Sequence, residues 1–521
     1  MSDLVAQLRE KDGTAAALLL IVSVAALLRF YSLAAESLWF DETYSVWVAR
    51  HPVAWHIALS TQRIFPPLYY LCLHFWLGLG SSEFVVRSLS VWLGLASIVA
   101  VYGLAKQLFD ARVGLLSALL LAISPLHIWY SQEARMYILV ATLGLCSAYF
   151  MLCALRQGRL WHWVAYVLST AALMNTHYFA IFLVPFQNAY VLYLLLRKQI
   201  QLDVLRHWLV SQGAAALLSV MGLAGIFSAE SGYWWGLLDT WHGAPTVADL
   251  LGVMFSFSLG TTIQGRWIYW GGLFVFGLCV LASCFSIGRR RLLLLSDGGL
   301  AFALLYFAVP IGTVFALSQF RSFWVLRYIF PFLPPYCIIV ARGISNLWRL
   351  GEAESGTDLR NGKSQDPSRR AAMRTAGRAL ALVLLAAIVL TSTWPIANIY
   401  RYEHKENWRS AVSYLAAQEQ ANDLILLVDE DIWLPFEHYY DGSTRRIGVS
   451  RVVTDRDLLA ARVGTVLPHY SRMWLVLSHT DNFLLKDYLT ASRCTELVSE
   501  KHFTGIEIDL FNIQLTVANC G

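Results

Sequence analysis

The chain has 521 residues, of which 57% are hydrophobic and 14% are charged, and its formal net charge is +5. Soluble proteins carry about a quarter charged residues, so this composition excludes an ordinary soluble domain and predicts a polytopic membrane protein. No basic stripe accompanies a nucleic-acid-binding motif, so we expect no nucleic acid as a partner. We expect the positive excess in loops that face the cytoplasm.

The first long apolar run, Ala15 to Ala34, has about 20 residues, which is enough to span a bilayer. It exceeds a typical signal-peptide core, so we interpret it as an uncleaved first helix. The stretch Ser37-Leu38-Trp39-Phe40-Asp41-Glu42-Thr43-Tyr44 follows and places two adjacent carboxylates where a membrane helix meets water. Arg29 and Arg50 are the cations nearest to them in sequence. The stretch is either a polar loop with interfacial aromatics or a catalytic base at the lip of a membrane cavity.

Apolar runs recur up to residue 397. They lie at 14–34, 67–80, 85–107, 113–130, 137–156, 161–174, 178–196, 208–228, 268–287, 298–318, 325–348 and 379–397. The run 67–80 is short for a bilayer span, so we expect an interfacial helix there. The other runs predict about eleven transmembrane helices.

Loop charges predict the orientation of these helices. With the N-terminus in the cytoplasm, arginine and lysine clusters fall in the cytoplasmic loops, as the positive-inside rule requires. The loop 351–370, rich in Gly, Ser, Asp and Arg, is then a flexible cytoplasmic linker. The outside segments are 35–84, 131–136, 175–177, 229–267, 319–324 and the tail from 398 to 521. The Asp41–Glu42 pair therefore faces outside.

The tail, 398–521, has mixed charges and short apolar runs, in contrast to the transmembrane domain at 1–397. We predict helices at 408–418 and 483–489 and strands at 424–428, 473–477 and 506–511. Helices between apolar strands indicate a small α/β domain. Cys494 and Cys520 lie in this tail, and an extracytoplasmic location leaves a disulfide between them open.

Two outer loops carry polar groups at helix ends. Glu133, Arg135 and Tyr137 belong to the first, and His177 and Tyr178 to the second. Glu133 and Arg135 form either a local ion pair or a polar wall facing Asp41. His177 is either a structural hydrogen-bond donor or a contact for a sugar or a metal.

Arg327 and Tyr328 fall inside the outer edge of the predicted span 325–348. Charged groups at that depth are costly and usually functional, and the arginine fork suits phosphate oxygens, so we favour phosphate binding over snorkelling to lipid headgroups. Arg87 has the same two interpretations, as does Arg29. Arg266, at the end of the loop 229–267, is also placed to approach a phosphate.

These outward-facing groups predict a class of reaction. The chain has no G-x-x-x-x-G-K-[ST] loop, so nucleotide hydrolysis is not indicated. A reaction outside the cytoplasm needs an activated donor that reaches that side, and a lipid-linked phosphosugar meets that need. Arginines can stabilise its leaving phosphate.

The sequence resembles a known superfamily in several places. The motifs are Leu38-Trp39-Phe40-Asp41-Glu42, Pro66-Pro67-Leu68-Tyr69-Tyr70, Glu83 with Val86-Arg87-Ser88-Leu89, Ser124-Pro125, Ser131-Gln132-Glu133-Ala134-Arg135-Met136-Tyr137, Thr176-His177-Tyr178 and Arg327-Tyr328 with Pro331 and Pro334. They resemble the bacterial relatives of protein O-mannosyltransferases and the lipid A aminoarabinose transferases. These are membrane glycosyltransferases of the C-type (GT-C) fold. The resemblance covers most of 1–350 and extends more loosely to the tail.

The resemblance implies a polyprenyl-phosphate sugar donor and transfer with inversion at the anomeric carbon. It implies that Asp41 is the base and that Glu42, its neighbour, shapes the acceptor site. The sequence departs from the family at Phe65, where relatives often carry Lys or His. Either Arg63 substitutes there, or phosphate binding rests on Arg327, Tyr328 and Arg266.

A single displacement needs only one base when the leaving group is a phosphate, so one carboxylate and several cations suffice. Some relatives use a divalent metal, but no ligand spacing here predicts one, and we expect no essential cofactor. Candidate sugar or acceptor contacts are Glu133, Arg135, Tyr137, His177 and Tyr178, and candidate donor contacts are Arg327, Tyr328, Arg266, Arg63 and Arg87.

Two alternatives stay open. One is a ligase or polymerase that moves oligosaccharides from a lipid-diphosphate carrier, and the other is a transporter of lipid-linked sugars. The expected location is the bacterial plasma membrane, with the C-terminal domain in the periplasm. The acceptor, a glycan, a lipid or a protein, is not defined by the sequence.

Overall fold

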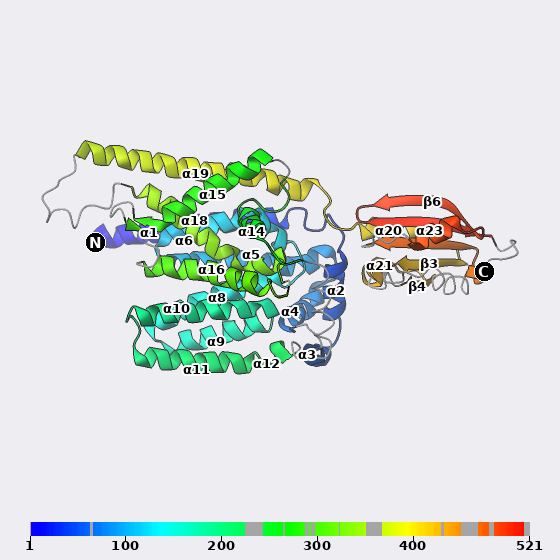
Figure 1. Ribbon diagram of the computed structural model, residues 1–521, viewed down its shortest axis with the longest axis horizontal. Coiled ribbons are helices and arrows are strands. Elements are labelled where there is room, and N and C mark those ends of the chain that lie inside the picture. The colour runs from blue at the N-terminus through cyan, green and yellow to red at the C-terminus, as the bar shows by residue number, and fades with distance from the viewer. Residues whose placement is uncertain are drawn as a thin grey trace. The chain divides into compact units, whose positions relative to one another are not determined.

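The computed structural model describes residues 2–62, 66–224, 243–263, 266–286, 291–292, 297–321, 323–350, 367–428, 432–449, 467–478 and 484–514. Its contacts divide the chain into two compact units, each of which is described by itself (Figure 1). The membrane unit comprises Met1–Ser32, His51–Gly78 and Arg87–Arg401. The second unit, called the α/β unit here, comprises Leu33–Arg50, Leu79–Val86 and Tyr402–Gly521. The tail thus shares its unit with two short N-terminal segments, which the sequence did not predict.

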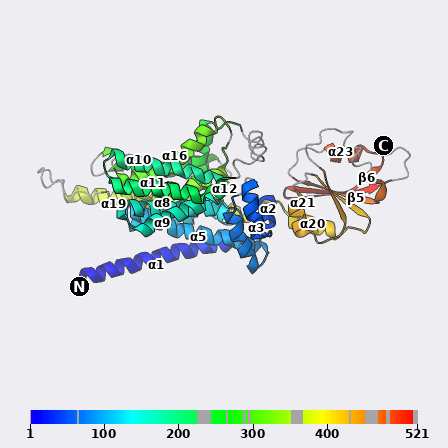
Figure 2. The ribbon, with the colours of Figure 1, turned by 90° about the horizontal axis from the view of Figure 1, so that it is seen from below.

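The membrane unit is helical. Its main elements are α1 (Ser2–Phe30), α3 (Val53–Gln62), α4 (Leu68–Trp76), α5 (Glu83–Leu108, whose first turn belongs to the α/β unit), α6 (Ala111–Ala122), α7 (Pro125–Ser131), α8 (Tyr137–Gln157), α9 (Leu160–Met174), η2 (Tyr178–Phe182), α10 (Leu183–Leu196), α11 (Leu202–Leu218), α12 (Val220–Ala224), α14 (Val247–Leu259), α15 (Arg266–Cys284), α16 (Gly298–Leu317), α17 (Leu326–Ile329), η4 (Phe330–Phe332), α18 (Leu333–Trp348) and α19 (Pro367–Arg401). Helix α9 packs against both α8 and α11 and lies between them in Figure 1, and Figure 2 shows α1 along one edge of the unit.

Seven helices in the described part of the chain are long and apolar enough to cross a membrane, or eight if the bent pair α6–α7 counts as one span. The prediction was about eleven. The runs 161–174 and 268–287 form shorter helices, Leu160–Met174 and Trp270–Cys284. A helix of 15 residues is about 22 Å long, which is less than the roughly 30 Å of a bilayer core. The multi-pass helical fold is confirmed, and the run 67–80 is the predicted short helix, Leu68–Leu79.

Helices α6 and α7 are separated by a bend of 64°. Pro125 occupies the first position of α7, where its missing N–H costs nothing, and Ser124 caps the helix by accepting from the His127 N–H. The regular helical hydrogen bonds stop at the break, where Leu121 O accepts a long bond from the Ser124 N–H at 3.4 Å, so the last carbonyls of α6 need further donors. Arg29, fully buried in α1, donates to two of them, Leu121 O at 3.2 Å and Ala122 O at 3.0 Å.

The same guanidinium also forms hydrogen bonds with side chains of α7. Arg29 donates to His127 Nδ1 at 2.8 Å and to Ser131 Oγ at 3.2 Å. Because arginine has no acceptor, His127 Nδ1 accepts, and its ring proton is on Nε2, which donates to Ser97 Oγ at 2.8 Å. The interpretation of Arg29 as a phosphate or headgroup ligand is therefore wrong, since its guanidinium binds protein groups in the membrane unit.

Replacement of Arg29 by methionine is expected to destabilise the protein by about 2–4 kcal/mol, because buried carbonyl groups at the helix break lose the guanidinium that donates to them. The measurement is thermal unfolding of the purified protein in detergent. Arg206→Met is the matched control, since Arg206 is exposed and forms an ion pair with Asp203 on the surface of the same helix. Equal unfolding temperatures for the two variants would contradict the structural role of Arg29.

The α/β unit contains a five-stranded sheet in the order β4-β3-β5-β7-β6. Strand β3 is parallel to β4 and to β5, and β7 is antiparallel to β5 and to β6. In register, Leu426 of β3 lies opposite Ile447 and Leu475. The elements are α2 (Phe40–Ala49), α20 (Trp408–Ala416), β3 (Asp423–Val428), α21 (Trp433–Tyr439), β4 (Arg445–Val449), β5 (Arg472–Ser478), α23 (Leu484–Ala491), β6 (Thr495–Phe503) and β7 (Ile506–Ile513).

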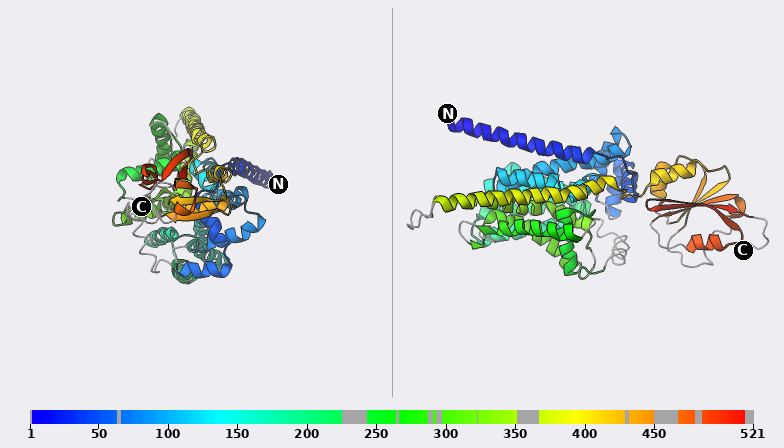
Figure 3. Two further views of the ribbon diagram at one scale, coloured as in Figure 1. Left: turned by 90° about the vertical axis from the view of Figure 1, so that its right-hand side faces the viewer. Right: turned by 90° about the horizontal axis from the view of Figure 1, so that it is seen from above.

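Each face of this sheet has its own core. Helices α20 and α21 cover one face, where Trp408, Phe436 and Trp474 pack together. Helix α23 covers the other face, and Figure 3 shows helices on both sides of the sheet. On the face that α23 covers, Leu485 and Leu489 pack on Met473. Alternate residues of β3 enter the two cores, with Ile425 on the first face and Leu424 on the second, as the period of a strand requires.

The predicted α/β character of the tail is confirmed, and all five predicted elements lie within two residues of α20, β3, β5, α23 and β7 at their start. Strands β4 and β6 were not predicted. Strand β6 is exposed at most positions, so it lacks the apolar pattern that identifies a strand. Most of the predicted linker 351–370 lies outside the described residues, and from Pro367 onward the chain is helical. Cys494 is disulfide-bonded, and Cys520 lies outside the described residues.

Asp509 of β7 is a buried carboxyl group beside an ion-pair cluster. Burial raises its pKa from the ordinary 3.8 to about 6, although Lys486 opposes the shift with Nζ at 3.3 Å. The folded state therefore holds this proton more tightly than the unfolded chain does. Consequently the contribution of Asp509 to the free energy of unfolding is lost as the pH rises through this range.

Asp509→Asn is expected to raise the stability at pH 7.5 by up to about 2 kcal/mol and to change it little at pH 4, where the wild-type group is already protonated. Thermal unfolding in detergent at the two pH values measures the difference. Asp487→Asn, an exposed change on α23, is the control. A variant less stable than wild type at pH 7.5 would contradict the expectation.

Candidate functional site

Asp41 and Glu42 lie in the first turn of α2. The extended residue Trp39 precedes the helix, and its carbonyl accepts from the N–H groups of Glu42 and Thr43. Carboxylates are favourable at a helix N-terminus because the helix dipole is positive there. The two side chains differ in environment: Glu42 is fully buried, while Asp41 is partly exposed.

Glu42 is paired with a cation from the far end of the sequence. Lys405 Nζ lies 3.2 Å from Glu42 Oε1, and the lysine side chain is only 10% exposed. The sequence had indicated Arg29 and Arg50 as the nearby cations. Arg29 belongs to the network at the α6–α7 break, and Arg50 is the C-cap at the other end of α2.

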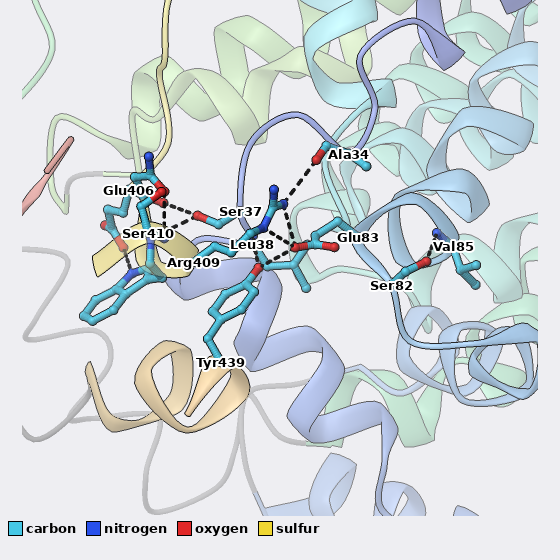
Figure 4. A network of polar contacts seen from close by, with 12 residues as sticks. Ala34, Ser37, Leu38, Ser82, Glu83, Val85, Glu406, Arg409, Ser410 and Tyr439 are labelled. Atoms are coloured by element: carbon cyan, nitrogen blue, oxygen red, sulfur yellow. Dashed lines mark hydrogen bonds and ion pairs between the residues drawn. The ribbon is translucent and has the colours of Figure 1, made fainter. Parts of the chain in front are cut away.

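The segment before α2 is held by hydrogen bonds to residues that follow α19. Ser37 Oγ donates to Glu406 O at 2.6 Å and accepts from the Trp408 N–H at 3.0 Å (Figure 4). Glu36 Oε1 accepts from the His404 N–H at 2.5 Å. These bonds fix the path of 404–408 along 36–37.

A second set of contacts in the α/β unit centres on Glu83. Arg409 donates to Glu83 Oε1 from Nε at 3.0 Å and from Nη2 at 2.6 Å. Tyr439 donates to the same oxygen at 3.1 Å and accepts from the Leu38 N–H at 2.7 Å (Figure 4). Burial raises the pKa of the Tyr439 hydroxyl well above its ordinary value, so it remains a donor at neutral pH. The segment that precedes Asp41 is thus attached to α20 and α21.

Most of the other predicted site residues gather in the membrane unit. The ring of Tyr328 lies 5.2 Å from that of His177 and 6.3 Å from that of Tyr137, measured between centroids. The Arg327 guanidinium lies 5.5 Å from the Tyr328 ring, and that of Arg135 lies 5.8 Å from the Tyr137 ring. We call Arg135, Tyr137, His177, Arg327 and Tyr328 the arginine–aromatic cluster.

His177 is neutral in this cluster. Burial, together with the charges of Arg135 and Arg327, lowers its pKa to about 3. Its Nδ1 accepts from the Phe179 N–H at 3.2 Å, so the ring proton is on Nε2. The imidazole therefore offers a donor and no charge. A neutral donor beside two guanidinium groups suits an anionic or hydroxyl-rich ligand.

Glu133 and Tyr178 lie close to this cluster in the chain, and both are buried. Tyr130 connects Glu133 to the cluster, since its hydroxyl interacts electrostatically with both Glu133 and Arg327. Arg87 is buried in α5 and is not one of the side chains that define the cluster. Arg63 and the side chain of Arg266 lie outside the described residues, so their predicted phosphate contacts stay predictions.

The residues that the sequence did not single out are Lys405, Arg409 and Tyr439. The sequence did contain one indication that these cations have partners. Arg401, Lys405 and Arg409 follow the last apolar run on the side predicted to be outside, where the positive-inside rule disfavours such clusters. Cations that break this rule are expected to have carboxylate partners, and the structure pairs two of them with Glu42 and Glu83.

The two groups of residues offer different chemistry. Helix α2 presents a partly exposed carboxylate next to a buried, charge-balanced one, which suits a general base. The arginine–aromatic cluster offers guanidinium donors, a neutral imidazole and aromatic faces, which suit a phosphate and a sugar. In the described part of the chain, the group of ligand-type side chains close enough to share a metal ion is Glu500, His502 and Glu507, away from both groups in the sequence.

Known proteins resemble this chain in part of its sequence and in its fold. Residues 65–225 match the sequence family described as dolichyl-phosphate-mannose-protein mannosyltransferase. No curated protein matches the chain.

Solved structures resemble the chain over most of its length. ArnT from Cupriavidus metallidurans in the apo state aligns with a TM-score of 0.62 and 14% identity, covering 96% of this chain and 98% of ArnT. ArnT bound to undecaprenyl phosphate aligns with a TM-score of 0.56 at the same identity and coverage. The archaeal oligosaccharyltransferase AglB from Archaeoglobus fulgidus, in complex with an inhibitory peptide and a dolichol-phosphate, gives 0.57 and 12% identity, covering 89% of this chain and 69% of AglB. The chain therefore has the GT-C fold, and its predicted resemblance to the membrane glycosyltransferases of that superfamily is confirmed.

Proposed function

We propose that the chain is an inverting glycosyltransferase that moves a single sugar from a polyprenyl-phosphate donor to an acceptor at the outer face of a bacterial plasma membrane. The observation that carries the proposal is the contrast between two adjacent carboxylates. Glu42 is buried and balanced by Lys405, whereas Asp41 is partly exposed at the start of α2. A carboxylate in the setting of Asp41 is suited to take a proton from a bound acceptor.

In the proposed reaction, a hydroxyl oxygen of the acceptor attacks the anomeric carbon, and its proton passes to Asp41. The bond between that carbon and the donor phosphate breaks, and polyprenyl phosphate leaves as an anion. Arg327 and Tyr328, with Arg135, bind the phosphate and stabilise the charge that develops on it. His177, Tyr137, Tyr178 and Glu133 contact the sugar or the acceptor. No essential metal takes part.

Two comparisons support the donor class. One solved structure of the same fold, ArnT, contains undecaprenyl phosphate, and another, AglB, contains a dolichol-phosphate. The family match at 65–225 bears a name that includes dolichyl-phosphate-mannose. A polyprenyl-type phosphate is thus named in both structures and in the family.

The test is sugar transfer by the purified protein in detergent, with a panel of polyprenyl-phosphate sugars as donors and a lipid extract as acceptor. We expect one or a few of these donors to be consumed and a glycosylated product to form with inverted configuration. Consumption of lipid-diphosphate oligosaccharides in place of the monophosphate sugars would contradict the proposal.

That second outcome would favour an oligosaccharide ligase, and the resemblance to an oligosaccharyltransferase is the observation behind it. Translocation of a donor across vesicles without any product would instead favour a transporter of lipid-linked sugars. The two alternatives differ from the proposal in the donor consumed and in the bond that is broken.

A further inference from the structure

The ion pair between Glu42 and Lys405 joins the start of α2 to the chain that follows the last membrane helix. The carboxylate has no exposed surface, and the ammonium nitrogen lies 3.2 Å from its Oε1. A buried carboxylate without a cation is strongly unfavourable, so Glu42 depends on a partner. Lys405 is supplied by the α/β unit, the same unit that contains α2.

We propose that Lys405 is a positioning residue for the reaction: it fixes the place and the charge of Glu42, and through Glu42 it holds the first turn of α2 that carries Asp41. The proposal rests on the proposed function, in which Asp41 is the base. Under this proposal, the α/β unit contributes to the rate of sugar transfer.

Hydrogen bonds fix the backbone around Lys405, so this lysine differs from a mobile cation on the protein surface. Glu36 accepts from the His404 N–H, and Ser37 bonds to both Glu406 and Trp408. The side chain of Trp408 is fully buried in the core of the α/β unit. The backbone that carries Lys405 is therefore fixed on both sides, and the ion pair with Glu42 places its ammonium group.

Asp41 and Glu42 are consecutive residues in the same helical turn, so a displacement of one carries the other with it. A misplacement of about 1 Å in a catalytic group can cost about 100-fold in rate. Loss of the cation at Glu42 is therefore expected to lower turnover more than it lowers donor binding.

The variants are Lys405→Met, Lys405→Arg, Glu42→Gln and the double variant Lys405→Met with Glu42→Gln. We expect Lys405→Met to lower kcat about 10- to 100-fold and to change the donor KM less than about threefold. Lys405→Arg is expected to recover most of the loss. In the Glu42→Gln background, Lys405→Met is expected to lower kcat less than about threefold further, because the two residues act through one pair.

Lys486→Met is the matched control, since Lys486 forms ion pairs with Glu500, Glu507 and Asp509 in the same unit, and none of these three partners is a proposed site residue. We expect it to keep kcat within about twofold of wild type. Equal losses for Lys405→Met and Lys486→Met would overturn the proposal, as would fully additive losses in the double variant.

Amide hydrogen exchange of Phe40–Ala49, measured without donor, tests the positioning role apart from activity. We expect faster exchange in Lys405→Met than in wild type or in Lys486→Met, with recovery in Lys405→Arg. Unchanged exchange in Lys405→Met would overturn the inference. If wild type transferred no sugar, the proposed function would fail, and the exchange result alone would decide whether Lys405 holds α2.

Discussion

Replacement of Asp41 by asparagine is expected to lower sugar transfer by about 100-fold to 10,000-fold, which is the usual contribution of a general base. The amide has nearly the shape of the carboxylate but cannot accept the acceptor proton. Donor binding is expected to stay within about threefold of wild type, because the donor phosphate is assigned to Arg327, Tyr328 and Arg135. The measurement is initial rate against donor concentration for the purified protein in detergent.

Asp441→Asn is the matched control for this experiment, since Asp441 is exposed in the same unit, before β4. We expect it to transfer sugar at the wild-type rate. Transfer by Asp41→Asn at the wild-type rate would remove Asp41 from the mechanism. Retained translocation of donor by a variant that makes no product would identify the activity as transport.

Replacement of Arg327 by glutamine is expected to lower kcat/KM by about 100-fold to 1,000-fold, the range seen when one preorganised donor to a developing anion is removed. Arg327 is part of the cluster with Tyr328 and His177, so its loss also removes a positive charge beside that imidazole. Binding of polyprenyl phosphate alone, measured by its protection against thermal unfolding, is expected to weaken in parallel.

Arg327→Lys tests whether charge or fork geometry matters. Lysine keeps the charge but offers no planar pair of donors, so we expect it to recover binding more than turnover. Arg321→Gln is the control, because Arg321 is an exposed arginine six residues before Arg327 and is not a member of the cluster. Unchanged binding of polyprenyl phosphate in Arg327→Gln would assign this arginine to lipid headgroups, the alternative that its depth in the membrane left open.

The α/β unit contains the proposed base as well as the tail. The segment that carries Asp41 and the segment that carries Glu83 cluster with the tail by their contacts. Deletion of the tail would therefore remove Lys405, Arg409 and Tyr439, and with them the partners of Glu42 and Glu83. We expect function to depend on the tail even if the tail itself contacts no substrate.

Much of the candidate site was predictable from residue type and position. Arg327, Tyr328, Arg135, Tyr137 and His177 were predicted as outward-facing groups at helix ends, and the structure brings them together. Polar and charged groups at the ends of apolar runs are costly, so their presence alone indicates a role. Their mutual distances were not predictable, because they depend on how the starts of α8 and η2 pack against α17.

The sequence by itself determined the membrane class, the order of the apolar helices and the five predicted elements of the tail. Hydropathy and periodicity are local properties, and they act within a single helix or strand. Only the tertiary structure decided that Lys405 balances Glu42, that Arg409 and Tyr439 hold Glu83, and that Arg29 serves a broken helix. A buried charge needs a partner of opposite charge. Which distant residue supplies that partner depends on the path of the whole chain, and the local sequence pattern does not predict this path.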